Sequence, residues 1–197
     1  MGLSASYREE TMLDIVTKSN FSVKPAPVPV ELQQEIEQFY FWEAKLMGDR
    51  RWETWFTLMS KEIEYWAPLR TTRIMREAEK EYTDEHGYAH FFDDWNMLEG
   101  RIRKIMSDVG WSENPASRLR HIVSNVLIWK GAEEGEYDVS TSVITYRNRQ
   151  ERQADIFSAE RQDKIRRVDD ERGFEVVKRK ILLDQSTVLS NNISFFF

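Results

Sequence analysis

The sequence predicts an α+β fold in which about three N-terminal helices pack in a strongly bent antiparallel or mixed sheet, giving a cone. Three observations predict it. Apolar residues recur at helical spacing in the first half of the chain, four β-type runs follow from residue 118, and the last run changes its apolar face. A chain of 197 residues can bury a sizeable core. We therefore expect a single domain over residues 30–197, preceded by an extended arm over residues 1–29.

The arm is predicted from its prolines. Pro25, Pro27 and Pro29 alternate, and each fixes its φ angle and lacks an amide donor, which favours an extended backbone. We expect the arm to lie along a surface, for which a partner subunit is one candidate.

Two helices are predicted after the arm. Residues 30–47 carry apolar side chains at spacings of three and four, and Gly48-Asp49 ends the pattern. Residues 52–59 repeat this spacing over a shorter stretch, so an antiparallel helix pair is expected. The apolar stripes consist of Leu32, Ile36, Phe39, Tyr40 and Leu46, then Trp52, Trp55, Phe56 and Met59.

A strand, a charged excursion and a third helix come next. Residues 63–68 alternate like a strand, and Pro68 suits only an edge or a strand end. Residues 70–90 are highly charged and are expected to leave the core. Residues 93–108 show helical spacing after Asp93-Asp94, whose carboxylates suit the N-terminal end of a helix.

The second half of the chain reads as four strands with turn residues between them. The runs cover residues 118–129, 137–146, 153–168 and 174–184. In the last run the apolar set moves from Phe174 and Val176 to Val177, Ile181 and Leu183. Such a change of face predicts a β-bulge or a strongly bent strand.

The sequence closes on Phe195, Phe196 and Phe197. Burying each ring removes on the order of 2 kcal/mol of hydration cost, whereas three exposed rings would be adhesive. We expect this segment to dock into the core or against another subunit.

Composition excludes several classes of function. The formal charge of −6 disfavours nucleic acid and anionic membrane surfaces. The absence of cysteine removes disulfides, zinc-thiolate sites and iron–sulfur ligation, a Rieske cluster included, since that cluster needs two thiolates. No apolar run resembles a signal peptide or a membrane span, so a cytoplasmic location is expected. An aromatic content of 13% exceeds what a small monomer needs and indicates a subunit interface.

Two kinds of active site can be considered. A cone cavity would allow His121, with Asp93 or Asp94, to transfer protons in an isomerase or dehydratase. The simpler interpretation is a half-buried histidine that bonds to a backbone carbonyl, and large side chains filling the cavity would count against catalysis.

The second kind of site is a metal site. His86 and His90 lie four residues apart, and either aspartate would complete a two-histidine, one-carboxylate iron site. Gly87 and the charged surroundings do not sustain the helix that this spacing needs. We therefore expect no catalytic, cofactor-binding or metal-binding residue in this chain.

The basic residues have a structural and an intermolecular interpretation. Acidic residues are scattered among them, which favours ion pairs across neighbouring strands. Alternatively, arginines bind carboxylates of neighbouring chains, where planar bidentate geometry suits an interface. The interface candidates are Arg147, Arg149, Arg152 and Arg179, together with Phe195, Phe196 and Phe197.

Several segments resemble one family closely. They are residues 31–40, 68–73, 100–104, 111–126, 146–157 and 181–194. Together they resemble the small (β) subunit of aromatic-ring-hydroxylating Rieske dioxygenases, over residues 30–197, and most closely the biphenyl, cumene, benzene and toluene branch.

The resemblance implies a cone fold similar to nuclear transport factor 2 and scytalone dehydratase. It also implies a non-catalytic structural subunit, in a hexamer of three large and three small subunits whose small subunits form a trimer. The large subunit would carry the Rieske [2Fe-2S] cluster and a mononuclear non-haem Fe(II). NADH would supply electrons through a reductase and usually a ferredoxin, and an arene and dioxygen would give a cis-dihydrodiol.

Overall fold

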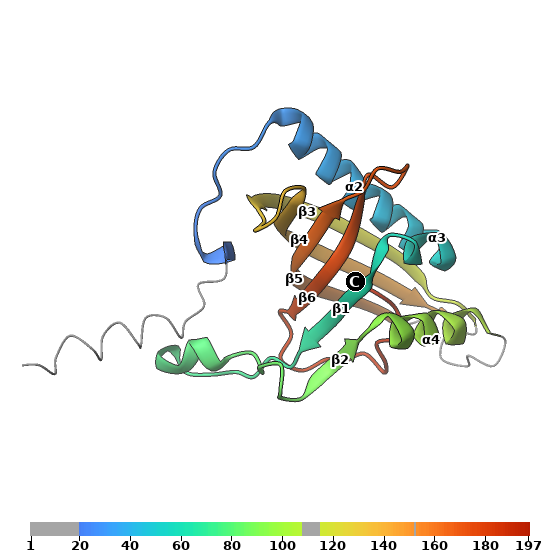
Figure 1. The fold of residues 1–197 in the computed structure, drawn as a ribbon. Coiled ribbons are helices and arrows are strands. Elements are labelled where there is room, and N and C mark those ends of the chain that lie inside the picture. Colours follow the sequence, from blue (N-terminus) through green and yellow to red (C-terminus); the bar gives the residue numbers. More distant parts are fainter. Residues whose placement is uncertain (1–19, 108–114, 152) are drawn as a thin grey trace, which may run out of the picture.

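The structure, a computed structural model, describes residues 20–107, 115–151 and 153–197. Its centre is one six-stranded sheet in the order β2-β1-β6-β5-β4-β3 (Figure 1). Strand β1 runs parallel to β6, and the other neighbours are antiparallel. The strands are β1 (Met59–Pro68), β2 (Ala89–Asp93), β3 (Arg118–Lys130), β4 (Glu136–Arg149), β5 (Gln153–Arg167) and β6 (Phe174–Leu183). The sheet is curled and mixed, which confirms the predicted fold class.

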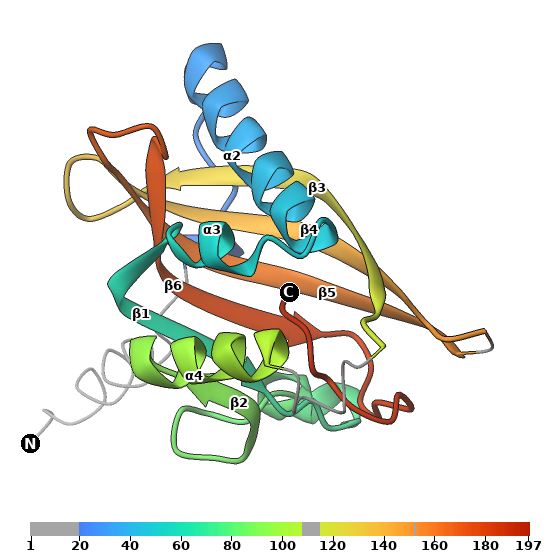
Figure 2. The ribbon, with the colours of Figure 1, turned by 90° about the vertical axis from the view of Figure 1, so that its right-hand side faces the viewer.

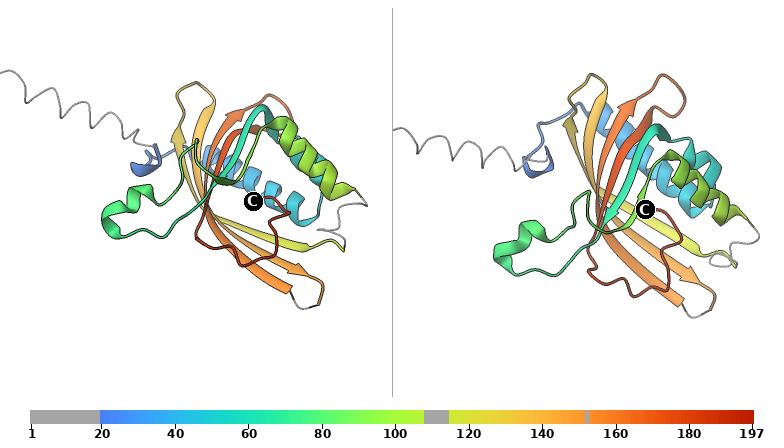
Figure 3. Two further views of the ribbon diagram at one scale, coloured as in Figure 1. Left: turned by 90° about the horizontal axis from the view of Figure 1, so that it is seen from below. Right: turned by 60° about the horizontal axis from the view of Figure 1, so that its bottom comes forward.

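The three α-helices lie on the concave side of the sheet. They are α2 (Val30–Gly48), α3 (Trp52–Phe56) and α4 (Trp95–Met106). Helix α2 packs against β3, α4 packs against β1, and α3 contacts both helices. Figures 2 and 3 show the strands bending around this group, with the C-terminal end of the chain on the same side. The predicted cone is thus a curved sheet filled by helices. None of the helices described is long and apolar enough to cross a membrane.

Helix α2 matches the predicted helix over residues 30–47. Its buried side carries Ile36, Phe39, Tyr40, Leu46 and Met47 at helical spacing, and Glu43 lies among them. The helix starts directly after Pro29, whose carbonyl accepts the first helical bond from the amide of Gln33 at 3.0 Å. After Gly48 the chain turns sharply, with Arg50 in the left-handed region at φ 58°.

Two boundaries were wrong. The second helix stops at Phe56 rather than near Met59, because Met59 pairs with Val176 of β6 and belongs to β1. The excursion was predicted to run to residue 90 and the third helix to start at residue 93, but residues 89–93 form the short edge strand β2 against β1. The third helix was predicted correctly, and Asp94 caps it by accepting a bond from the Met97 amide at 2.9 Å.

The predicted bulge lies in β6. Lys164 of β5 is opposite Lys178, whereas the next residue, Ile165, is opposite Val176, so Val177 is the extra residue. Because of this extra residue, Val176 and Arg179 both face the interior although three positions separate them.

Two peripheral segments leave the sheet. Residues 69–88, with the 3-10 helix η2 (Met75–Lys80), project from the end of β1 as the predicted excursion (Figure 1). At the other periphery, Phe21 of η1 (Asn20–Ser22) meets the Trp129 ring at 5.3 Å, and the Trp129 indole donates to the Val23 carbonyl at 2.7 Å. The described end of the arm therefore lies on β3 of its own chain. Residues 1–19 lie outside the described residues, and the boundary between residues 29 and 30 stays a prediction.

Candidate functional site

A cluster of four charged side chains lies inside the cone. Glu43 comes from α2, Arg161 and Asp163 from β5, and Arg179 from β6, and each is at most 1% exposed. We call these four residues the Glu43 cluster. Its two acids and two bases balance, so the interior carries no net charge from them. Charges buried this deeply are tolerated only when they are paired and hydrogen-bonded.

Arg179 is the centre of the cluster. Its Nη1 and Nη2 atoms lie 2.5 and 3.1 Å from the two oxygens of Glu43. Its Nε and Nη2 atoms lie 3.0 and 2.7 Å from the two oxygens of Asp163. Nη1 also donates to the Phe197 carbonyl at 2.9 Å. All five N–H groups of the guanidinium therefore have acceptors, in the planar fork geometry that only arginine offers.

Glu43 is bonded on both oxygens by groups from three elements. Besides Arg179, Arg161 donates to Oε2 at 3.0 Å and the Trp55 indole donates to Oε1 at 3.1 Å. Burial alone would raise the pKa of Glu43, but the guanidinium groups of Arg179 and Arg161 outweigh it and lower the pKa to about 2. The carboxylate is thus held ionised and engaged, not available as a general base at neutral pH.

The backbone of residues 195–197 is hydrogen-bonded by side chains from several elements. Arg101 of α4 donates to the Phe195 carbonyl at 3.2 Å, and His121 Nε2 of β3 lies 2.9 Å from the Phe196 carbonyl. The Tyr65 hydroxyl of β1 accepts from the Phe197 amide at 2.8 Å and lies 3.1 Å from the Phe197 carbonyl. We call residues 190–197 the C-terminal segment. Each of its last three carbonyls has a dedicated partner.

The three rings of this segment are fully buried. Phe196 stacks on Trp55 with centroids 4.5 Å apart, and the Arg101 guanidinium lies 4.7 Å from its ring centroid. Phe195 and Phe197 pack against Phe157 of β5 at 5.0 and 5.8 Å. Of the two predicted locations, core or neighbouring subunit, the structure shows the core. The large side chains fill the interior beside His121.

The three residues of the catalytic hypothesis, His121, Asp93 and Asp94, have structural partners instead. His121 is buried and meets the Phe196 carbonyl, and burial lowers its pKa to about 4, so it is neutral near pH 7. Asp93 pairs with Arg101, and Asp94 caps α4. In the three described ranges, no three histidine, aspartate or glutamate side chains gather as a metal site would require, His86 and His90 included.

The arginine candidates divide into two groups. Arg147 and Arg179 are completely buried and bind groups of their own chain, Arg147 through Ser117 at 3.0 Å and the Asn192 carbonyl at 3.1 Å. Both lie inside their own chain and not on a subunit interface. The three phenylalanines do so too, in the core location that was the other prediction for them. Cross-strand pairing, the alternative interpretation, is correct for Arg179 and Asp163. Arg149 is half-buried at the end of β4, where its interface role stays a prediction, and Arg152 lies outside the described residues.

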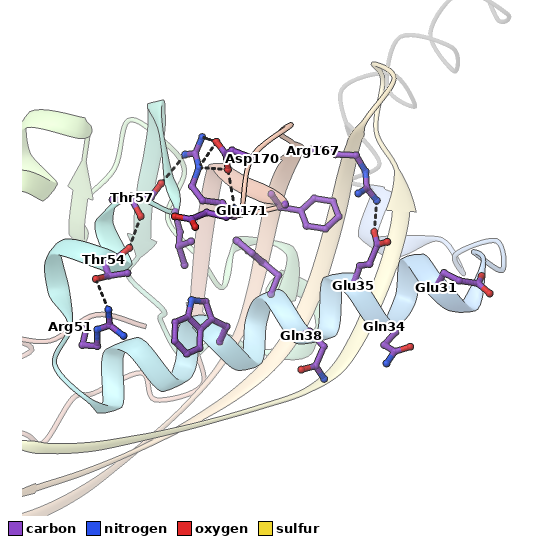
Figure 4. A pocket seen from close by; sticks show the side chains of 16 residues that line it. Glu31, Gln34, Glu35, Gln38, Arg51, Thr54, Thr57, Arg167, Asp170 and Glu171 are labelled. Carbon is purple, nitrogen blue, oxygen red and sulfur yellow. Dashed lines mark hydrogen bonds and ion pairs between the residues drawn. The ribbon is translucent and has the colours of Figure 1, made fainter.

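An open hollow of about 970 Å³ lies elsewhere, between α2, α3 and the turn from β5 to β6 (Figure 4). Figure 4 shows Glu31, Gln34, Glu35 and Gln38 along the α2 side of this hollow. Arg167 of β5 pairs with Glu35 of α2 across the opening at 2.6 Å. Arg172 pairs with Asp170 at 2.6 Å within the turn from β5 to β6. These ion pairs are accessible to water and form a polar rim around the hollow. Their carboxylates are engaged by arginines, which does not suit a general base.

Glu43, Arg161 and Asp163 were missed as site residues, although the sequence carries a signal for each. Glu43 is a single carboxylate on the apolar stripe of α2. Arg161 and Asp163 continue the inward alternation of Phe157 and Ala159 on β5. Charged residues at positions that a periodic pattern assigns to the core indicate a buried ion-pair network.

A cone whose interior is filled by a neutral ion-pair cluster and by its own chain defines a structural cone-fold protein. Comparison with known proteins gives the family. The family model described as "Ring hydroxylating beta subunit" matches residues 42–190. The chain belongs to this family and is a β subunit of an aromatic-ring-hydroxylating dioxygenase, part of an oxidoreductase complex.

Individual relatives agree. The chain is 60% identical to the benzene 1,2-dioxygenase subunit beta of Pseudomonas putida, over 94% of this chain and 100% of the relative. It is 61% identical to the biphenyl 2,3-dioxygenase subunit beta of Rhodococcus jostii (strain RHA1), over 90% and 95%.

Among solved structures, naphthalene 1,2-dioxygenase with bound indole matches at 20% identity and a TM-score of 0.77, covering 99% of this chain and 96% of that one. A putative scytalone dehydratase from Novosphingobium aromaticivorans DSM 12444 matches at a TM-score of 0.56 and 15% identity, covering 79% and 86%. Both likenesses concern the fold.

Proposed function

We propose that this chain is the non-catalytic, structural subunit of the terminal oxygenase of an aromatic-ring dioxygenase, in an assembly of three large and three small subunits. The observation that carries this proposal is the 60% identity along the full length of a benzene 1,2-dioxygenase β subunit. The filled interior supports a structural role, because Phe196 and Trp55 occupy the space that a substrate would need.

The redox centres belong to the large subunit in this proposal. A Rieske [2Fe-2S] cluster needs two thiolates and two imidazoles, and the sequence contains no cysteine. The partner would also hold the mononuclear non-haem Fe(II). NADH would deliver two electrons through a reductase and a ferredoxin. One arene, one dioxygen and one NADH with a proton would give one cis-dihydrodiol and NAD⁺, and we place the complex in the cytoplasm.

The substrate class follows from the relatives. Curated relatives are named for benzene, chlorobenzene and biphenyl. We propose that the complex acts on hydrocarbons of this kind, with one ring or two unfused rings.

Four exposed apolar side chains lie next to one another on the convex side of the sheet. Ile122 and Ile144 are direct cross-strand neighbours on β3 and β4, and Tyr146 and Ile156 are direct neighbours on β4 and β5. All four side chains are exposed, Ile122 to 59% and Ile156 to 64%. We call these four residues the convex patch. Adjacent exposed apolar residues of this kind mark protein contacts, and we assign the convex patch to contact within the oxygenase.

The test is reconstitution. The large subunit of a benzene dioxygenase is expressed alone and with this chain, and ferredoxin, reductase and NADH are supplied. We expect light scattering to show a mixed hexamer, and benzene oxidation to require both chains. Oxidation by this chain without a large subunit, or full activity and assembly of the large subunit without this chain, would contradict the proposal.

A further inference from the structure

The C-terminal segment has the features of a bound peptide. Its connection to β6 crosses the surface, where Ser186 and Thr187 are exposed and Leu189 is 92% exposed. The chain then re-enters the molecule beside Arg147, which donates to the Asn192 carbonyl at 3.1 Å. Residues 184–197 contribute no helix or strand. The segment is thus a separate piece of chain joined to the domain by one exposed crossing.

The backbone of residues 195–197 is held as a peptide ligand is held. In the described residues, side chains of Arg101, His121, Tyr65 and Arg179 make its hydrogen bonds, rather than a strand ladder. These four side chains come from α4, β3, β1 and β6, so the cone presents them whether or not the segment is covalently attached. Main-chain hydrogen bonds provide affinity, and pockets for side chains provide specificity, as in other modes of peptide recognition.

Three residues on the receptor side, Arg179, Arg101 and Trp55, are positioned by partners outside the segment. Arg179 keeps four of its five donor contacts on Glu43 and Asp163 and offers only one to Phe197. Arg101 is fixed by Asp93, and Trp55 is fixed by Glu43. A site whose groups are positioned by their own partners loses little freedom on binding.

We propose that the interior of the cone is a peptide-binding site for a short extended segment with consecutive aromatic side chains. In the intact chain its ligand is residues 188–197, bound in cis. The same peptide binds there in trans once the covalent connection is cut. This inference concerns the single chain and goes beyond the proposed subunit function.

The first test cuts the folded protein. A recognition sequence for a specific protease is inserted between Thr187 and Val188, and the full chain is purified folded and then cleaved. We expect the fragment 188–197 to co-elute with the body on gel filtration. Excess fluorescent synthetic peptide 188–197 should then replace it in a saturable manner. A peptide with Phe195, Phe196 and Phe197 all changed to alanine should not compete.

Two variants test the hydrogen bonds. Tyr65→Phe removes the hydroxyl that contacts both the amide and the carbonyl of Phe197, so release of the fragment should be about tenfold faster. Tyr88→Phe is the matched control, because the Tyr88 side chain is 85% exposed and, among the described residues, only the backbone carbonyl of this residue is hydrogen-bonded, to the Thr83 hydroxyl. Release of the fragment from this variant should be unchanged.

A second measurement needs no insertion. In the uncut chain, amide hydrogen exchange of residues 195–197 should be faster than that of β5, and Tyr65→Phe should accelerate it selectively. Three outcomes would overturn the proposal. In the uncut chain, the amides of residues 195–197 would exchange hydrogen only by global unfolding. In the cut protein, the fragment would leave a body that stays folded, or the added peptide would fail to replace the fragment.

Discussion

At the scale of single residues, the molecule depends on Arg179. Its guanidinium joins α2 through Glu43, β5 through Asp163 and the C-terminal segment through the Phe197 carbonyl. Removing one partner of such a buried network leaves the others charged and without their ligands in a medium of low polarity. The cluster therefore connects four parts of the chain, namely α2, β5, β6 and the C-terminal segment. A change in its interaction energy should affect the stability of all four.

Arg179→Met should destabilise the chain by about 3–5 kcal/mol, because Glu43 and Asp163 stay buried without their shared cation. The control is the neighbouring Lys178→Met. Lys178 is partly exposed and pairs with Glu64 at 2.7 Å, so the loss should be below about 1 kcal/mol. Urea unfolding measures both. Equal losses for the two variants would mean that the cluster has no special role in stability.

His121 should make stability depend on pH. Burial lowers its pKa from 6.5 to about 4 in the folded chain, so the unfolded chain binds more protons between these values. The contribution of neutral His121 to the free energy of unfolding is then fully present above pH 6.5, and it falls as the pH decreases toward 4. The part between pH 7 and pH 5 amounts to about 2 kcal/mol.

The measurement is urea unfolding of the native chain and of His121→Gln at pH 7, 6 and 5. Whatever its absolute stability, the variant should lack the decrease assigned to His121, whereas His86→Gln, at an exposed position, should keep it. An unchanged slope in His121→Gln would show that another group titrates. Glu43, with a pKa of about 2 in the folded chain against 4.5, adds its own decrease only below pH 4.5.

At the scale of elements, helix α4 positions Arg101 over the C-terminal segment. Asp94 is the N-cap of the helix, and its carboxylate accepts from the Met97 amide. About two turns later the helix presents Arg101 to Asp93 and to the Phe195 carbonyl. A defined helix start therefore fixes where Arg101 lies. The cap is local in sequence, but it also helps to position Arg101 for its contact with Phe195, which is distant in sequence.

Asp94→Ala should lower the free energy of unfolding by about 1 kcal/mol, because the Met97 amide loses its acceptor. Asp94→Ser should restore most of the loss, since serine is a good N-cap. Thermal unfolding followed by circular dichroism measures all three proteins. If the alanine and serine variants were equally unstable, the aspartate would act through its charge and not through capping.

Elements with a strong local pattern could be predicted from the sequence, and contacts across the fold could not. Helix α2 follows from its stripe, and the bulge at Val177 follows from the change of face in β6. The edge strand β2 is only five residues long and depends on pairing with β1, which no local pattern reveals. Likewise, the local sequence predicts that the phenylalanines are buried. It does not predict that their carbonyls bond to Arg101, His121 and Arg179, because these partners come together only in the folded sheet.

At the scale of the whole molecule, the two sides of the sheet have opposite characters. The concave side is closed by helices and by the C-terminal segment, with its polar groups largely bonded within the chain. The convex side carries the exposed apolar side chains of the convex patch on β3, β4 and β5. Stability and assembly are thereby assigned to different sides, so variants of one side need not affect the other.

A charge on the convex patch should therefore weaken assembly while sparing the fold. In the double variant Ile122→Asp/Ile156→Asp, both changed side chains are more than half exposed, so the free energy of unfolding should change by less than about 0.5 kcal/mol per site. Burying two unpaired carboxylates at a subunit contact would, by contrast, cost several kcal/mol.

The measurement is light scattering of the variant mixed with the large subunit, beside urea unfolding of the variant alone. We expect a smaller assembly and reduced arene oxidation with an unchanged unfolding midpoint. Met75→Asp is the matched control, because Met75 is 95% exposed on the excursion of residues 69–88, away from the convex patch, and it should assemble normally. Normal assembly of the double variant would remove the convex patch from the contact, and failure of Met75→Asp alone would transfer that role to the excursion.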